Sequence, residues 1–221
     1  AVAQRDLKQL LAASTCAQIG FMVLAAGVAS IEGGVGQLVA HAAVKSLLFL
    51  CAGVWLTVLG TKDLRELQGA AWRNRVVGVA FGMGALALAG IPPLSLWVTK
   101  DVVLAAAVAE GSWVLYAVGL AASVLAAAYS ARALVAVWRR GERHGSEGAF
   151  RFPMLAPLPV LAFIAVVFGV VAVPGVDESW RGLLGASGEP APNLTELLIS
   201  GALAVVTVVA VAGLARHRRG T

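Results

Sequence analysis

The chain has 221 residues, of which 59% are hydrophobic and only 13% are charged, and its mean hydropathy is +0.85. A soluble domain of this length needs more polar surface, so the composition excludes an ordinary water-soluble fold. The net charge of +5 does not indicate nucleic-acid binding, because the bases gather in short segments between apolar runs, as in membrane proteins.

Apolar runs of membrane-spanning length recur along the chain. Residues 9–31, 76–99, 152–176 and 197–215 carry no charge. Backbone in lipid must satisfy its own hydrogen bonds, and roughly 20 helical residues cross the hydrocarbon core. We therefore predict an all-α membrane protein of about six transmembrane helices, integral to the inner or plasma membrane. The predicted spans are 9–30, 35–59, 75–109, 112–138, 153–174 and 195–215.

The third span is too long for one ordinary membrane helix, and it contains Pro92 and Pro93 in succession. Two consecutive prolines remove two backbone donors and clash with the preceding turn. We expect a discontinuous span, with a half-helix at 75–90, an irregular stretch, and a second half-helix at 96–109.

The charges between the spans predict an orientation. One side collects thirteen bases: Arg5, Lys8, Lys62, Arg65, Arg73, Arg75, Arg139, Arg140, Arg143, Arg151, Arg216, Arg218 and Arg219. The other side has six acids, with Arg181 as its only base: Glu32, Glu110, Asp177, Glu178, Glu189 and Glu196. The positive-inside rule then places both termini in the cytoplasm. We expect the outer segment 175–194, rich in Gly and Pro, to be irregular.

Three polar residues lie inside the second predicted span. Gln37, His41 and Lys45 are spaced by four, so they share one helix face. An ionisable residue inside a span costs about 3 kcal/mol or more, which makes it a functional candidate. A proton could hop along this stripe through bridging water. The alternative is a polar network that only holds helices together.

Lys100 and Asp101 follow the proline break, in the outer half of the third predicted span. Burial disfavours the charged form of either group, which suits a proton relay. A discontinuous helix also lets backbone carbonyls line a hydrated cavity. The alternative is an ion pair near the surface. Ser14, Thr15 and Gln18 in the first span either line water or serve as packing contacts.

We expect no redox cofactor and no metal on this chain, and no catalysis of covalent chemistry. The sequence has no cysteine cluster for iron–sulfur, no histidine pair at haem spacing and no phosphate-binding loop. Cys16 and Cys51 both lie in apolar runs, and we expect both to be small core residues.

Several strings, in order, resemble the antiporter-like subunits of respiratory complex I (NADH:quinone oxidoreductase), especially the L-type subunit. They are 5–15 (RDLKQLLAAST), 18–22 (QIGFM), 41–50 (HAAVKSLLFL), 62–69 (KDLRELQG), 86–94 (LALAGIPPL) and 99–101 (TKD). Mrp-type cation/proton antiporters, membrane-bound hydrogenases and inorganic-carbon uptake subunits are relatives of the same family. Gln37 departs from the pattern, because many members have a second His there.

The resemblance implies a fold of two inverted repeats and a proton pathway across the bilayer. It implies that Lys45 is the central relay near midplane, that His41 helps connect along the membrane, and that Lys100 leads to the outer exit. FMN, iron–sulfur clusters and quinone are then expected on partner subunits, and the partners are other membrane subunits and the lipid bilayer.

The resemblance also implies that the chain corresponds to the second repeat of a longer subunit. We expect 1–140 to be this second-repeat portion, and 141–221 to hold two further membrane helices and a basic cytoplasmic tail. Ala1 in place of an initiator Met suggests a processed or partial chain. Besides a redox-driven proton pump, an Mrp-type antiporter, a hydrogenase or carbon-uptake subunit, and a non-conducting structural subunit remain open as functions.

Overall fold

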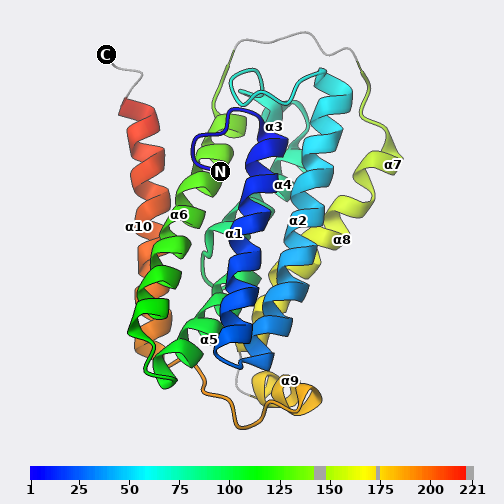
Figure 1. Cartoon of the computed structure of the whole chain (residues 1–221). Helices are drawn as coiled ribbons and strands as arrows, with labels where there is room; N and C mark the ends of the chain where they lie inside the picture. Colours follow the sequence, from blue (N-terminus) through cyan, green and yellow to red (C-terminus); the bar gives the residue numbers. More distant parts are fainter. Residues whose placement is uncertain (142–147, 173–174, 218–221) are drawn as a thin grey trace.

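The computed structural model describes residues 1–141, 148–172 and 175–217, and this part of the chain is a bundle of helices (Figure 1). Arg143, Arg218 and Arg219, expected above among the cytoplasmic bases, lie outside the described residues. The longer helices are α1 (Leu7–Gly27), α2 (Ile31–Leu59), α4 (Arg75–Ala89), α5 (Ser95–Ala109), α6 (Trp113–Trp138), α8 (Pro157–Val167) and α10 (Leu194–His217). Shorter elements are α3 (Ala70–Arg73), α7 (Phe152–Leu155), the 3₁₀ helix η1 (Phe168–Ala172) and α9 (Val176–Leu184).

The predicted membrane fold is confirmed. In the described ranges, five segments are long and apolar enough to cross a membrane, namely α1, α2, α6, Phe152–Val171 and α10. The half-helices α4 and α5 follow one another along the bundle (Figure 1) and add a sixth crossing to these five. The start of α1 and the end of α10 lie toward the same end of the bundle, which agrees with an even number of crossings between them.

The helix starts follow from local capping residues. The Asp6 carboxylate accepts a hydrogen bond from the backbone N–H of Gln9 at the start of α1, and Ser30 caps α2 through the N–H of Gly33. Asn74 accepts from two backbone N–H groups at the start of α4. Each cap satisfies a donor that the first helical turn leaves free.

The break between α4 and α5 occurs where the prolines predict it. Gly90, with φ of 79°, ends α4 in the left-handed conformation that glycine adopts most easily. The backbone N–H groups of Gly90 and Ile91 donate to Ala87 and Leu86, which closes the helix end as a Schellman motif. Because Pro92 has no N–H, the carbonyl of Leu88 has no donor within its own helix.

Two glycines from other helices allow close packing against the break. A Cβ on Gly201 of α10 would lie 2.7 Å from Cγ of Pro92. A Cβ on Gly169 of η1 would collide with the carbonyl oxygen of Pro93. The irregular stretch is therefore packed on two sides, by α10 and by η1. Both approach it so closely that a side chain larger than that of glycine would not fit.

α2 and α4 lie at the centre of the bundle, and their buried side chains pack against the surrounding helices. α2 packs against α1, α4, α5 and α8, and α4 also packs against α6. The rings of Trp55 and Phe81 meet at a centroid distance of 4.9 Å in this core. Cys51 is fully buried, as expected. The same expectation for Cys16 is wrong, because its side chain lies on the exposed face of α1.

Two expectations about the segments between the spans are wrong. Residues 176–184 form helix α9 rather than irregular chain; Asp177 and Arg181 form an ion pair one turn apart there, which supports the helix. α2 begins at Ile31 rather than 35, so Glu32 belongs to its first turn. Glu32 is only 2% exposed instead of lying in an open loop.

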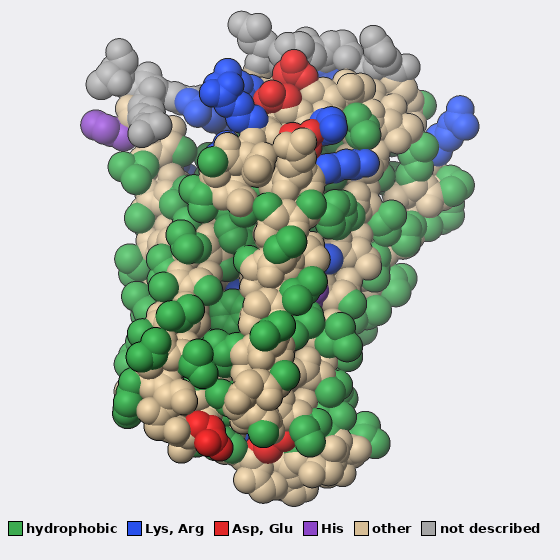
Figure 2. Space-filling model, viewed as in Figure 1, with side chains coloured by type: hydrophobic (Ala, Val, Ile, Leu, Met, Phe, Trp, Pro, Cys, Tyr) green, Lys and Arg blue, Asp and Glu red, His purple; other side chains and the backbone are tan. Residues whose placement is uncertain are grey.

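Hydrophobic side chains cover the sides of the bundle, and charged side chains gather at its ends (Figure 2). In this view Lys and Arg are concentrated at the end where α1 begins and α10 ends, together with some acidic groups, whereas acidic groups predominate at the opposite end. We call these the basic end and the acidic end. This distribution is the one that a bilayer around the bundle requires.

Candidate functional site

Lys45 lies midway along α2 and is 6% exposed. Its amine donates a hydrogen bond of 2.9 Å to the carbonyl oxygen of Leu11 on α1 and another to the hydroxyl of Ser14. The Ser14 hydroxyl in turn donates to the Leu11 carbonyl over 2.8 Å, so its oxygen remains free to accept from the lysine. The amine is thus solvated by neutral oxygens of the neighbouring helix.

His41 lies one turn before Lys45 on the same face of α2 and is also 6% exposed. Its Nε2 is shielded from solvent and has no hydrogen-bond partner among the described residues. A buried ring nitrogen without a partner is uncommon in folded proteins, so His41 stands out among the polar groups of α2.

Gln37 belongs to a chain of hydrogen bonds that crosses four helices. Its amide nitrogen donates to the amide oxygen of Gln18 on α1 over 2.9 Å, and its amide oxygen accepts from the hydroxyl of Thr99 on α5 over 2.6 Å. The Gln18 amide nitrogen donates to the hydroxyl of Tyr129 on α6 over 3.2 Å. All four side chains are buried, so the network lies wholly inside the bundle.

Lys100 is 2% exposed and lies in the second half of the broken span. Its amine donates to the carbonyl oxygen of Leu88 over 3.1 Å. This is the carbonyl that loses its helical donor because residue 92 is proline. The ring of Phe21 covers the amine at 5.6 Å from its centroid, which adds a cation–π contact. The proline break therefore creates the acceptor that binds this lysine.

Asp101 does not form an ion pair with Lys100, since neither residue takes part in the salt bridges found in the described ranges. The carboxylate instead accepts a hydrogen bond of 2.5 Å from the hydroxyl of Ser200 on α10. Trp97 donates to the same hydroxyl over 3.1 Å. An ion pair near the surface, the alternative left open by the sequence, is thus wrong: both charged groups are buried and they have separate partners.

Ser200 and Tyr129 are partners that sequence reasoning missed. Each lies in an apolar run, where a single hydroxyl is common and carries no pattern of its own. The sequence shows Gln18 and Ser14 only as polar positions within a span, and the structure connects them to Gln37 and Lys45 respectively.

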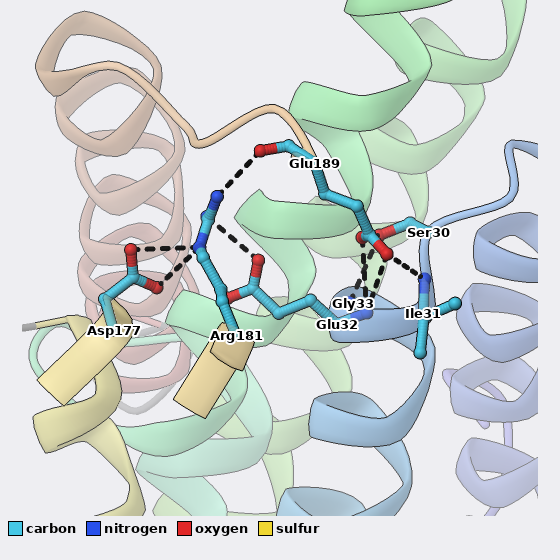
Figure 3. Close-up of polar contacts among 7 residues, drawn as sticks. All are labelled: Ser30, Ile31, Glu32, Gly33, Asp177, Arg181 and Glu189. Atoms are coloured by element: carbon cyan, nitrogen blue, oxygen red, sulfur yellow. Dashed lines mark hydrogen bonds and ion pairs between the residues drawn. The ribbon is translucent and has the colours of Figure 1, made fainter. Parts of the chain in front are cut away.

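A second polar cluster closes the acidic end of the bundle (Figure 3). Arg181 of α9 forms ion pairs with Glu32 at 2.9 Å and with Asp177 at 3.0 Å, and it donates to the backbone carbonyl of Glu189 over 2.7 Å. The Glu189 carboxylate accepts from the backbone N–H of Ile31 over 2.8 Å and from the hydroxyl of Ser30 over 3.0 Å. The segment that carries α9 is therefore fastened to the N-terminus of α2, where a carboxylate is favourable.

The sequence profile of the family described as "NADH:quinone oxidoreductase/Mrp antiporter, TM" matches residues 1–126. The chain belongs to this family. The matched stretch contains Gln37, His41, Lys45, Lys100 and Asp101, whereas Arg181 and Ser200 lie beyond it.

Members of the family from several organisms are similar to this chain. NADH-quinone oxidoreductase subunit L of Rickettsia bellii is 34% identical over 76% of this chain and 26% of its own length. F(420)H(2) dehydrogenase subunit L of Methanosarcina mazei is 34% identical over 80% of this chain and 29% of its own length. A Na(+)/H(+) antiporter subunit of Alkalihalophilus pseudofirmus is 30% identical over 79% of this chain and 36% of its own length. The chain thus spans about a quarter to a third of these relatives.

Two solved structures show the same arrangement of helices. The Mrp complex from Dietzia sp. DQ12-45-1b superposes with a TM-score of 0.76 and 26% identity, over 98% of this chain and 25% of that one. Respiratory complex I from Thermus thermophilus superposes with a TM-score of 0.68 and 22% identity, over 93% of this chain and 41% of that one. The antiporter-like fold expected from the sequence is confirmed.

Proposed function

We propose that this chain forms part of a transmembrane proton pathway in the membrane arm of a complex I-like NADH:quinone oxidoreductase. The observation that carries the proposal is the pair of buried amines, Lys45 on α2 and Lys100 behind the helix break, each held by neutral groups of the described residues. A buried amine without a fixed counter-ion can change its charge with a small change in its surroundings.

In this proposal Lys45 holds a proton at mid-depth and His41 connects it along the membrane. Lys100 receives the proton and passes it outward, and Asp101 modulates this release. Gln37 lines the route but does not itself relay, because its amide is held on both sides by Gln18 and Thr99. Its contribution is to fix α1, α2 and α5 around the route.

The position of the Asp101 carboxylate supports an outward direction of the proposed route. Its carboxylate meets Ser200, and Glu196 lies one turn nearer the start of α10, toward the acidic end. We place both chain termini in the cytoplasm on the positive-inside rule, so that α9 and the cluster around Arg181 face outward. Partner membrane subunits supply the rest of the pathway, and FMN, iron–sulfur clusters and quinone reside on other subunits of the assembly.

The test is proton pumping by the purified assembly in sealed vesicles. We expect Lys100→Ala and Lys45→Ala each to abolish proton translocation while electron transfer and assembly persist. Lys62→Ala is the matched control, because Lys62 is a lysine of the same chain whose side chain is 52% exposed. Unaltered pumping in Lys100→Ala would overturn the role of this residue.

A second candidate is an Mrp-type cation/proton antiporter subunit. The higher TM-score and identity of the Mrp complex favour it. Co-purification in mild detergent separates the two candidates. Flavin- and iron–sulfur-bearing partners indicate the redox-driven pump, whereas membrane subunits alone indicate the exchanger. Proton flux that does not depend on Lys45 in either assembly would favour a structural subunit instead.

A further inference from the structure

A cavity of about 270 Å³ lies between the last turns of α6 and α10. Three arginines line it, Arg139 and Arg140 directly after α6 and Arg216 in the last turn of α10. No acidic residue lines it within the described part of the chain, and none of its lining residues takes part in the proton route proposed above. The rest of its wall consists of Val135, Trp138, Ala212 and Ala215.

The charge of this cavity is positive even after the helix ends are counted. α6 and α10 both end here, and each helix C-terminus contributes about −0.5 of a charge. The two ends together offset about one positive charge, whereas Arg139 and Arg216 alone carry two, so an excess of about one positive charge remains from these two residues. Nε of Arg139 is buried and has no hydrogen-bond partner within the described part of the chain. An anion in the cavity would give this donor a partner, as buried donors require.

The surroundings indicate that the anion is attached to a hydrocarbon chain. The cavity lies at the basic end of the bundle, because its lining residues come from the last turns of α6 and α10, and the bilayer surface is expected at this level. The exposed face of α10 continues from it with large apolar side chains, since Leu214, Val209 and Val206 are each more than 60% exposed. Trp138 adds the kind of aromatic ring that settles at headgroup level.

We propose that the cavity between α6 and α10 binds the phosphate of an anionic phospholipid, with the acyl chains lying along α10. Arg139 and Arg216 hold the phosphate from the two helices. The lipid thereby joins α10 to the rest of the bundle at the basic end, away from the contacts of α10 with the helix break. This binding is independent of whether the assembly pumps or exchanges protons.

The experiment measures lipid retention by the intact assembly with native mass spectrometry. The assembly is delipidated and titrated with dioleoyl phosphatidylglycerol or with dioleoyl phosphatidylcholine. We expect the wild type to prefer phosphatidylglycerol. Each arginine near an anionic surface contributes about a fivefold factor, so Arg139→Gln with Arg216→Gln should weaken phosphatidylglycerol binding roughly 25-fold.

Two control variants separate this site from general charge effects. Arg5→Gln with Arg75→Gln removes two exposed bases of the same end outside the cavity and should leave the preference unchanged. Arg139→Lys with Arg216→Lys keeps the charge and should retain most of the binding. Equal binding of the two lipids, or equal phosphatidylglycerol binding by wild type and the double glutamine variant, would overturn the proposal. Displacement of the lipid by excess inorganic phosphate would also overturn it, because the site would then bind a free anion.

Discussion

Thr99 of α5 donates its hydroxyl to the amide oxygen of Gln37 on α2 over 2.6 Å, directly beside Lys100 in the sequence. A Cβ on Gly36 would approach Cγ2 of the same threonine to 3.2 Å, so α2 and α5 are in close contact at this level. The contact fixes the start of α5 relative to α2. It thereby sets the position of Lys100 relative to the helix that carries Lys45.

Replacing Gln37 tests whether this network positions helices. In Gln37→Leu the Gln18 amide and the Thr99 hydroxyl lose a partner inside the bundle, which should cost about 1–3 kcal/mol of stability. Thermal unfolding of the purified assembly checks this. Gln37→His should cost less because a ring nitrogen can replace one of the two bonds.

The control for Gln37 is Gln9→Leu, because Gln9 lies exposed at the start of α1 and contributes to the Asp6 cap only through its backbone N–H. An unchanged melting temperature in Gln37→Leu would contradict the positioning role. The same variant with normal stability but lost proton flux would instead make Gln37 part of the relay.

The packing of α10 against the helix break predicts a sharp difference between two glycines of one helix. In Gly201→Ala the new methyl group would lie 2.7 Å from Cγ of Pro92. We expect a loss of about 1–3 kcal/mol in unfolding free energy, as for overpacking elsewhere. Gly213→Ala meets no atom within 4 Å and should be neutral or slightly stabilising. Equal stability of the two variants would mean that α10 does not pack closely against the helix break at Pro92.

The fold could be predicted because its signals are local. Apolar runs of about 18 residues or more define spans without knowledge of their neighbours. Pro92 and Pro93 define the break in the same way, through chemistry within one segment. Lys45 and Lys100 could be found for a related reason, since a charge inside an apolar run is conspicuous by itself.

The partners of these residues could not be predicted from the sequence. Asp101 and Ser200 are 99 residues apart, and only the packing of α10 against α5 brings them together. Glu32 and Arg181 resemble ordinary loop charges in the sequence, because nothing local shows that α9 returns to the N-terminus of α2. The expectation for Cys16 failed for a related reason. In a membrane helix the lipid-facing side is as apolar as the core, so the sequence alone does not show which side a residue occupies.

Arg181 should be essential for the acidic end of the bundle. Arg181→Leu leaves the carboxylate of Glu32 buried without its cation, and breaking a buried pair costs about 3–5 kcal/mol. We expect the segment 185–193 to become sensitive to protease added to the purified assembly. Glu178→Gln, which removes an exposed charge from the same helix, should not change sensitivity. Full protease resistance in Arg181→Leu would show that apolar packing alone holds α9.

The lowered pKa of Asp6 predicts that the stability of the first turn of α1, at the basic end, depends on pH. Burial alone would raise the pKa of Asp6, but hydrogen bonds from Lys62 and from the Gln9 amide, with the lysine charge, lower it below its usual value. A carboxyl with a lowered folded-state pKa contributes stability above its unfolded pKa of about 3.9 and loses it as the pH falls through the folded value. Hydrogen exchange in the first turn of α1 should therefore accelerate below about pH 4 relative to an Asp6→Asn variant. The same pH profile in both proteins would contradict the role of the Asp6 charge.

Ser200 offers the most direct test of the outward route, which rests on the proposed proton pathway. Ser200→Ala removes the hydroxyl that donates to Asp101, while Trp97 keeps its bond of 3.3 Å to the carbonyl of Leu197. Losing one hydrogen bond to a carboxylate, worth about 1.5–3 kcal/mol, predicts that proton release becomes slower by about tenfold or more. Ser200→Thr keeps the hydroxyl and should restore the rate. The measurement is the rate of outward proton release in vesicles together with the melting temperature. A hydroxyl needed for proton release must affect the release rate even when the fold is intact. A lower melting temperature of Ser200→Ala with an unchanged release rate would therefore make Ser200 a packing residue only.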